Sequence, residues 1–375
     1  MSTPARVLSA VQSASRKAAA KHALIGFDGF VDTIVNVVDR RSGSGENFTA
    51  VPTITAFARR IDAAAGRSTN IELYPRMEKP GGNGPLMASA LAAAGVRVTL
   101  VGSLGAPDIH PAFSELATRC HVISLCPPGL TTALEFRDGK VMLGVHASLG
   151  AVTLPAIEAA MGADSFLRHL SGCDLIAPLN WTMLPSMTEI LRGLCDDVLP
   201  SLPATKTRHF FFDLCDPEKR SSSELIDVLK IISRFTTHGR VTLGLNFKEA
   251  SRIASDLAFA GRADSPDGMQ ALAADIRGDL GLGTVIVHTR RAAAAADEKG
   301  TAYVDGTYTE TPLISTGAGD HFNAGYARGL LLDLDSEACL ALGCATSGHY
   351  VRTASSPTAE DLENFLTRWK DGTLD

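Results

Sequence analysis

Short apolar runs alternate along the chain with longer stretches in which apolar residues recur every three or four positions. The runs are candidate strands, and the longer stretches are candidate helices. The candidate strands are residues 22–27, 96–104, 173–179, 208–214, 240–245 and 283–289, and the clearest candidate helices are residues 85–94, 184–199, 224–235 and 268–280. Because strands that are apolar throughout must be covered on both faces, this alternation predicts a doubly wound α/β fold with a mostly parallel sheet.

Three segments break this rhythm and predict a small separate sheet. Residues 31–41 and 69–80 have strand-like patterns without a full crossover helix, and residues 131–147 contain Asp138-Gly139, a hairpin signal. The linker-like segments 41–48 and 260–268 do not divide the chain into equal parts. We therefore expect residues 1–375 to form a single domain with the small sheet attached.

Two local patterns are harder to assign. The first 27 residues hold basic residues and no acidic ones, but Val7, Leu8 and Val11 are spaced as in a surface helix, which we prefer to a targeting segment. The five alanines from Ala292 predict a loop or the start of a helix.

Composition narrows the class of function. The net charge is -6 with a pI near 5.9, and the basic residues are scattered, which argues against nucleic acid and favours a small-molecule partner. No run approaches 18 apolar residues, so we expect no membrane span. The seven cysteines form no Cys-x-x-Cys pair, which predicts buried free thiols and a cytoplasmic setting.

The stretch Ser315 to Gly325, STGAGDHFNAG, carries the clearest chemistry. Apolar residues recur every four positions after it, so Asp320 lies at or near a helix N-terminus. The N–H groups of Gly317, Ala318 and Gly319 would form an anion site, and their small size would let a phosphate approach. Asp320 is then either a helix cap or a base beside an anion hole, and the local sequence leaves both open.

The same stretch resembles the C-terminal signature of the PfkB carbohydrate kinases, the ribokinase-like family. GGNGPLMASALAAAG (81–95) is similar to the family's N-terminal glycine-pair motif, and NFKE (246–249) matches its Asn-x-x-Glu motif. GFDGFVDTI (26–34) resembles the first strand with its sugar-binding aspartate. The similarity spans nearly the whole chain in the family's order, and it implies a ribokinase-like fold whose small sheet is a lid.

The resemblance implies a set of roles for particular residues. Asp320 would deprotonate the acceptor hydroxyl, and Gly317, Ala318 and Gly319 would form the anion hole. The substrate contacts would be Asp28, Asp32, Gly81, Gly82 and Asn83. The nucleotide contacts would be Asn246, Thr289, Arg290 and Thr316, and Asn246 with Glu249 would organise Mg²⁺ through water. The implied activity is phosphotransfer from ATP to a hydroxyl of a sugar-like substrate, with a homodimer contact through the lid.

The chain also departs from the family pattern. Ile314 replaces the aspartate that helps to bind a monovalent cation in ribokinase-like members, and Leu86 replaces an asparagine of the first motif. Arg290 and Arg291 follow the strand at 283–289, where they would meet nucleotide phosphates or form a solvated turn. Arg220 would either pair with a substrate carboxylate or be a surface arginine, and we prefer the latter.

Each motif has a plainer interpretation, and two other functions remain open. Asp28 would suit a turn, Asp32 an exposed edge strand, and Glu249 the first turn of a helix. A nucleoside kinase of the same fold is the first alternative, with Trp181 as a stacking face. A non-catalytic sugar-binding relative is the second, although it would have no reason to keep Asp320, Asn246 and Glu249.

Overall fold

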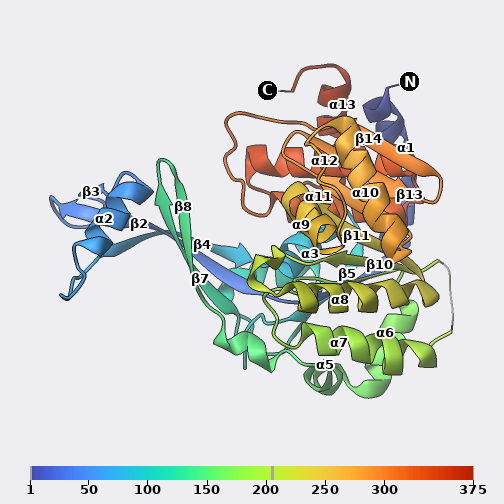
Figure 1. The fold of residues 1–375 in the computed structure, drawn as a ribbon, viewed down its shortest axis with the longest axis horizontal. Coiled ribbons are helices and arrows are strands. Elements are labelled where there is room, and N and C mark those ends of the chain that lie inside the picture. Colours follow the sequence, from blue (N-terminus) through green and yellow to red (C-terminus); the bar gives the residue numbers. More distant parts are fainter. Residues whose placement is uncertain (1, 204–206, 375) are drawn as a thin grey trace.

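The computed structural model describes residues 2–203 and 207–374 and contains two sheets (Figure 1). Within these residues the main sheet has nine strands in the order β14-β13-β12-β11-β10-β9-β1-β5-β6. Their bounds are β1 (His22–Phe27), β5 (Arg97–Gly102), β6 (His121–Ser124), β9 (Leu175–Pro178), β10 (His209–Asp213), β11 (Arg240–Asn246), β12 (Thr284–His288), β13 (Ala292–Asp297) and β14 (Gly300–Asp305). The strands from β12 to β6 pair in parallel, and β13 and β14 are antiparallel. The predicted mostly parallel sheet is confirmed.

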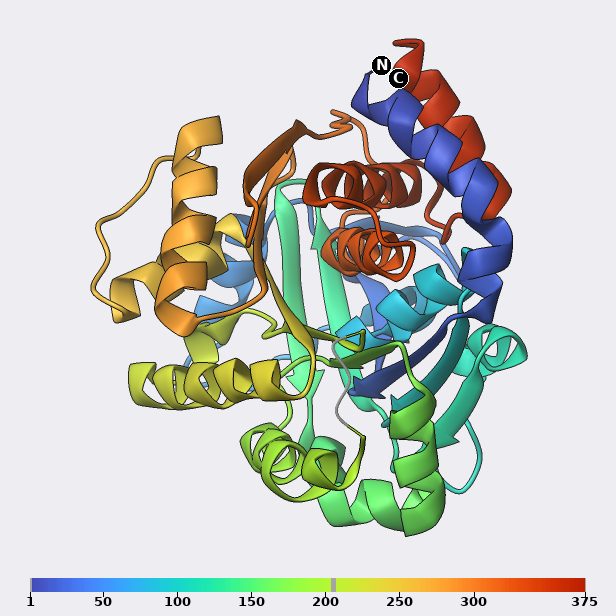
Figure 2. The ribbon, with the colours of Figure 1, turned by 90° about the vertical axis from the view of Figure 1, so that its right-hand side faces the viewer.

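Helices cover both faces of this sheet, and each layer has its own apolar core (Figure 2). One layer is formed by α5 (Leu154–Met161), α6 (Ala163–Gly172), α7 (Met187–Gly193), α8 (Ser222–Arg234), α9 (Phe247–Asp256) and α10 (Pro266–Leu280). The other is formed by α1 (Thr3–Ala20), α3 (Asn83–Ala93), α4 (Ser114–Arg119), α11 (Ala318–Leu331), α12 (Ser336–Thr353) and α13 (Ala359–Lys370). In β1, Leu24 belongs to the first core while Ala23 and Ile25 belong to the second, as strand alternation requires.

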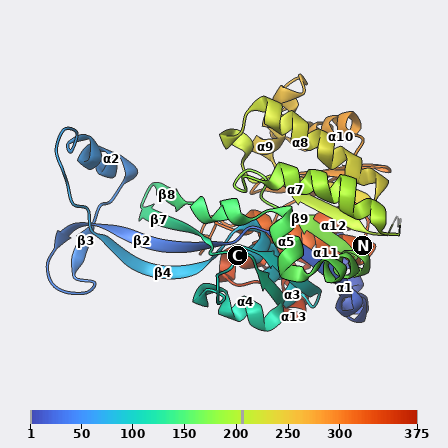
Figure 3. The ribbon, with the colours of Figure 1, turned by 90° about the horizontal axis from the view of Figure 1, so that it is seen from below.

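The second sheet projects from one side of the molecule (Figures 1 and 3). We call it the small sheet; it contains β2 (Phe30–Arg41), β3 (Phe48–Ala50), β4 (Leu73–Gly81), β7 (Gly129–Phe136) and β8 (Gly139–Val145). These strands overlap the predicted segments 31–41, 69–80 and 131–147, and the linker-like segment 41–48 is the turn between β2 and β3. Helix α2 (Ile54–Asp62) lies at the far end, where Phe57 packs beside a core of Val35, Val37, Val51 and Leu134.

The alanine run was predicted wrongly, because it forms β13 between β12 and β14. Alanine favours helices in isolation, but here the turn after β12 returns the chain along its neighbour. The Thr289 hydroxyl accepts hydrogen bonds from the N–H groups of Arg291 and Ala292 in that turn. Both α10 and α12 contact β13, and small side chains allow this close cover. Within the predicted helix at 184–199, the α-helix ends at Gly193, and Leu194–Val198 form a π-helical turn.

Two predictions from composition are tested by the described residues. Their cysteines are all free, and all but the half-buried Cys215 are buried, as expected. No helix formed by these residues is long and apolar enough to cross a membrane. The N-terminal segment forms α1, whose Val7 and Val11 are buried in the core beside α13.

Candidate active site

Asp320 occupies the third position of α11, as the apolar spacing predicted. Gly317 is the residue before the helix, with φ of 93°, and in the turn that follows, the Ala318 N–H donates to the Ser315 carbonyl at 3.2 Å. Burial raises the pKa of Asp320 well above its ordinary value, and the nearby carboxylates of Asp213 and Asp28 raise it further, while the Asn83 side chain opposes this by hydrogen bonding. These carboxylates come from the carboxyl ends of β10 and β1, the edge where open α/β sheets bind ligands.

Asp28 holds the start of α3 in place. Its Oδ1 accepts a hydrogen bond from Gly84 N at 2.7 Å, and its Oδ2 accepts from Asn83 N at 2.9 Å and Asn180 Nδ2 at 2.6 Å. The residue is fully buried, and that burial raises its pKa to about 6 despite these bonds. Asp28 therefore positions the predicted substrate loop through the backbone N–H groups of Asn83 and Gly84.

The two carboxylates of the first motif explain the glycine pair. A Cβ on Gly81 would lie 2.6 Å from Asp32 Oδ2, and one on Gly82 would lie 2.8 Å from Asp28 Oδ2. Gly82 also has φ of 96°, which side chains rarely adopt. Close approach of two acids, together with this backbone conformation, therefore requires glycine at both positions.

Asp32 lies on the face of the small sheet that looks toward the site. It is buried rather than on an exposed edge, because β2 pairs with both β4 and β7. Burial raises its pKa, and Lys79, a hydrogen bond from Thr131 and Lys140 act in the opposite direction. An ionised Asp32 would offer acceptors to ligand hydroxyls.

Two aromatic side chains fix the loop before α11. His321 Nδ1 lies 2.8 Å from the carbonyl of Gly317 and its Nε2 lies 2.9 Å from Ser356 Oγ, so the network assigns the proton to Nδ1. Burial lowers the pKa of His321 to about 4, which keeps the ring neutral. Tyr350 stacks on this ring at 3.6 Å, and its hydroxyl donates to the carbonyl of Thr316 at 3.0 Å.

Leu86, the departure in the first motif, packs against this same loop. A Cβ on Gly317 would lie 2.8 Å from Leu86 Cδ1 and 3.0 Å from the Tyr350 hydroxyl. The carbonyls and the shape of the loop are therefore held by protein groups from α3, α11 and α12. The described structure offers no role for Ile314 beyond its backbone contact with Val351.

Asn246 and Glu249 form a reciprocal cap at the start of α9. Asn246 Oδ1 accepts from Glu249 N, and the Glu249 oxygens accept from Asn246 N at 2.9 Å and Asp216 N at 3.0 Å. Burial and the neighbouring Asp213 raise the pKa of Glu249 to about 8. Helix capping is thus present, and a nearby cation would favour the ionised form of this buried acid.

The residues at this site would suit Mg²⁺ held through water, as the resemblance implies. Among the described residues, no group of three or more His, Cys, Asp or Glu side chains is placed to hold a metal ion. The side-chain oxygens of Asn246 and Glu249 already accept backbone hydrogen bonds. Each carboxylate or amide oxygen has a further acceptor position, which remains for water. Mg²⁺ ordinarily retains several waters and binds through few protein groups, which suits this arrangement.

A cavity of about 960 Å³ adjoins the anion-site loop. Its walls include the predicted nucleotide residues Asn246, Thr289, Arg290 and Thr316, together with Ala318 and Gly319. Arg291 also lines it, with its guanidinium 3.8 Å from the centre of the Tyr308 ring. Both arginines therefore line this cavity, and their contact with nucleotide phosphates stays a prediction.

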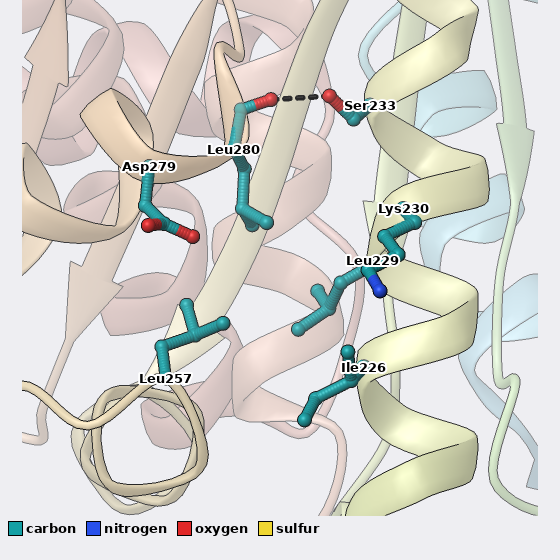
Figure 4. Close-up of a pocket in the computed structure, with 7 residues that line it drawn as sticks. All are labelled: Ile226, Leu229, Lys230, Ser233, Leu257, Asp279 and Leu280. Carbon is teal, nitrogen blue, oxygen red and sulfur yellow. Dashed lines mark hydrogen bonds between the residues drawn. The ribbon is translucent and has the colours of Figure 1, made fainter.

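A second cavity, of about 220 Å³, lies between α8 and the ends of α9 and α10 (Figure 4). Ser233 Oγ donates to the Leu280 carbonyl across it, and most of the remaining lining is apolar. It shares no residue with the larger cavity. It contains none of the site residues that the sequence predicted.

Two other predicted contacts are used inside the fold. Trp181 is buried, donates its indole N–H to Thr188 and lies 5.0 Å from the Arg220 guanidinium, so it offers no open stacking face. Arg220 donates to the carbonyls of Thr182 and Leu184 and pairs with Glu224. It is a largely covered structural arginine rather than the surface arginine that the sequence analysis preferred.

The sequence analysis missed several residues of the site. Asp213 accepts hydrogen bonds from Cys215 N at 2.8 Å and Asn323 Nδ2 at 2.6 Å, and burial raises its pKa to about 6. The run FFDLCDPEKR ends a buried strand with Asp213, and that position was the available signal. His321 and Tyr350 had no such signal, because their contacts join distant segments.

Comparison with known proteins identifies the family. Residues 1–369 match the model of the family described as prokaryotic ketohexokinase. The chain belongs to this family. It is 32% identical over 350 residues to a ketohexokinase of Haloferax volcanii, covering 93% of this chain and 91% of that protein. It is therefore a carbohydrate kinase of the PfkB family, as the motifs indicated.

Solved structures confirm the ribokinase fold. A fructokinase of Xylella fastidiosa with bound ATP has a TM-score of 0.64 at 13% identity, covering 94% of this chain and 99% of that one. An Arabidopsis thaliana ribokinase complexed with ribose and ATP has a TM-score of 0.63 at 16% identity, covering 92% and 98%. At these identities the likeness establishes the fold alone.

Proposed function

We propose that this protein is an ATP-dependent ketohexokinase. The observation that carries the proposal is the Haloferax volcanii relative, which matches over nearly its whole length, together with an acid beside an amide-lined loop at the end of a large cavity. We also propose the cytoplasmic setting that the sequence predicted, which the seven free cysteines support.

The proposed transfer uses Asp320 as the base. The acceptor hydroxyl loses its proton to the Asp320 carboxylate, and its oxygen bonds to the terminal phosphorus as the bond to the bridging oxygen breaks, releasing ADP. The amides of Gly317, Ala318 and Gly319 would face the charge on the transferred group, with that of Ala318 shared with the Ser315 carbonyl. A raised pKa suits this role, because a stronger base accepts the proton more readily near neutral pH.

The sugar would lie between α3 and the small sheet. We assign direct contacts to Asp32, Asn83, Gly81 and Gly82. Asp28 would position Asn83 through the hydrogen bonds to the start of α3, in addition to its predicted substrate role. Replacing Asp32 with alanine should raise the sugar KM by one to two orders of magnitude, because a charged hydrogen bond contributes about 1.5–3 kcal/mol. An unchanged KM would place the sugar elsewhere.

The nucleotide would occupy the large cavity, with Asn246, Thr289, Arg290 and Thr316 at its walls. Asn246 and Glu249 would hold the waters of Mg²⁺. When bound, this ion would neutralise phosphate charge during transfer. The residues of the chain would orient the triphosphate and exclude water from the reacting group.

We also propose that the small sheet is a lid and that its outer face forms a homodimer contact. Leu130, Leu143 and Val145 are each at least half exposed and share a face, opposite that of Asp32 and Thr131. An exposed apolar patch of this kind is typical of an interface. Light scattering should show a dimer, and Leu143→Asp should convert it to a monomer.

Turnover measurements test the main proposal. Purified protein would be given Mg-ATP, and separately Mg-ADP, with ketohexoses, aldohexoses, pentoses, sugar acids and nucleosides. Asp320→Asn would serve as the blank. We expect the highest kcat/KM with a ketohexose, and loss of that turnover in the blank. Preference for a nucleoside would reject ketohexokinase but retain the kinase, while binding of sugar without any turnover would indicate a non-catalytic relative.

A further inference from the structure

Two lysines from different strands of the small sheet face the anion-site loop. Lys140, at the start of β8, donates from Nζ to Thr316 Oγ1 at 2.8 Å, although the two residues are 176 positions apart in the chain. Thr316 also lines the large cavity. The small sheet therefore places a cation directly beside the loop that precedes α11.

Lys79, on β4, is the less usual of the two. It pairs in register with Asp32, so both side chains lie on the face that looks toward the site. Its Nζ is buried, and within the part of the chain that the structure describes it has no hydrogen-bond partner. A buried ammonium without a partner is costly, so its retention requires an explanation.

The neighbouring acids do not provide that partner. Asp32 and Asp320 act electrostatically on Lys79, but among the described residues neither forms an ion pair with it within 4.0 Å. Burial has the larger effect and lowers the pKa of Lys79. The ammonium thus lies near the sugar acid and near the base, in a place suited to an anion that arrives with a ligand.

We propose that Lys79 binds the transferred phosphoryl group from the side opposite the α11 amides, and that Lys140 assists it at the Thr316 edge. This inference rests on the proposed phosphotransfer. As the phosphorus moves from the bridging oxygen of ATP to the sugar oxygen, the proton goes to Asp320 and both lysines stay protonated. The phosphoryl oxygens would then meet amides on one side and ammonium groups on the other.

The position of both lysines on the small sheet also affects the access of water to the phosphoryl group. Both lysines belong to the small sheet, whereas the amides belong to α11, so the complete set of positive groups exists only where the two parts meet. A phosphoryl group held there is covered by the sheet that also carries Asp32. This arrangement favours transfer to the sugar over transfer to water.

Four variants test the role of Lys79. Lys79→Met removes the charge at similar length, Lys79→Arg keeps it, Lys140→Met removes the second cation, and Arg76→Met removes a charge on the same strand that pairs with Glu46. Steady-state kinetics would be measured with the best ketohexose. Calorimetry would measure binding of that sugar, of Mg-ADP and of Mg with a non-hydrolysable ATP analogue.

We expect Lys79→Met to lower kcat by about 30- to 1000-fold, with sugar affinity within about threefold of the wild type. It should also remove most of the preference for the ATP analogue over ADP, a readout that does not depend on turnover. Lys140→Met should show the same pattern at about a tenth of the size, Lys79→Arg should recover part of kcat, and Arg76→Met should match the wild type. Thermal unfolding should show Lys79→Met to be at least as stable, since an unpaired buried charge is lost.

The outcomes separate this inference from the proposed function. If the wild type turns over a sugar and Lys79→Met has the same kcat, the inference is overturned and the proposed kinase function stands. A raised sugar KM with normal kcat would also overturn it, because Lys79 would then be a sugar contact. A wild type that binds neither the ATP analogue nor ADP would overturn both.

Discussion

The two ends of the main sheet differ in how their buried acids are paired. At the carboxyl ends, burial raises the pKa of Asp28, Asp213, Asp320 and the nearby Glu249. At the amino ends, burial lowers the pKa of His22 and that of His209, the latter to about 4. The acid at this end, Asp174, is paired with Lys21 at 2.8 Å and accepts from His22 N at 2.9 Å.

This contrast distinguishes ionisable groups that stabilise the fold from acids that belong to the candidate site. At the amino ends the buried histidines are neutral, and the carboxylate has a cation beside it. At the carboxyl ends, none of the four acids forms an ion pair with Lys or Arg in the described part of the chain. Such a cluster lowers the stability of the free protein, and we interpret it as the place where Mg²⁺, nucleotide and sugar are received.

Asp320→Asn should give the largest effect. Removing a general base commonly costs 10²- to 10⁴-fold, so kcat should fall by about that factor while nucleotide affinity stays near the wild-type value. Because burial makes ionisation of this carboxyl unfavourable, the melting temperature of the free protein at neutral pH should rise. Asp267→Asn, at an exposed acid in the first turn of α10, is the matched control and should alter neither. Retained turnover would reject Asp320 as the base.

The next prediction concerns His209 at the amino ends, where stability is lost as the pH falls. The folded pKa of His209, about 4, lies below its ordinary value of 6.5, so its contribution is complete above pH 6.5 and is lost as the pH falls toward 4. The loss is about 3 kcal/mol at 1.36 kcal/mol per pKa unit. His209→Phe should remove that part of the acid sensitivity, measured by urea unfolding at pH 7.5 and 4.5.

The partly exposed His238 is the control for this experiment. His238→Phe should leave the difference between the two pH values unchanged. If His209→Phe also leaves it unchanged, then acid sensitivity arises elsewhere, and the contrast between the ends of the sheet is weaker than burial suggests.

Asp213→Asn tests the carboxyl ends without touching the reacting atoms. The folded pKa of Asp213 is raised, so its contribution to stability is present below about pH 4 and lost as the pH rises through about 6. The variant should therefore be about 3 kcal/mol more stable than the wild type at pH 8, and the gain should shrink toward pH 4. The Asn323 amide, whose Oδ1 has no partner among the described residues, can turn to accept from the new amide.

The same variant should change catalysis in a defined direction. Asp213 raises the pKa of Asp320 electrostatically, so its neutralisation should move the acid limb of the kcat/KM profile to lower pH. An acid limb that stays in place would mean that Asp320 does not control it.

Much of the fold followed from the sequence because apolar strands with both faces buried have a distinct pattern. The predicted strands at 22–27 and 240–245 are close to β1 and β11 in the structure. The alanine run failed because local propensity favours helix, whereas the pairing with β12 and β14 decides the outcome. Strand β3 was missed because it is only three residues long.

The site was predictable where motif residues are consecutive, and less so where partners are distant. Asp320 and the glycine pair stand in short continuous motifs. By contrast, Lys140 meets Thr316 only because β8 folds back over the loop, and Tyr350 reaches that loop from α12. No spacing rule for a helix or strand connects such positions, so only the tertiary structure brings them together.

Tyr350→Phe should give the smallest of these effects, and it tests whether the loop itself is part of the machinery. The change removes the hydrogen bond to the Thr316 carbonyl and keeps the ring stacked on His321. Loss of one neutral hydrogen bond of about 1 kcal/mol should lower kcat about fivefold, with the sugar KM unchanged. Tyr303→Phe, which removes a hydroxyl bonded to Asp305 on β14, is the control and should have no effect on kcat. If Tyr350→Phe lowers the melting temperature but not kcat, then the hydrogen bond supports the fold alone, and the anion site does not depend on it.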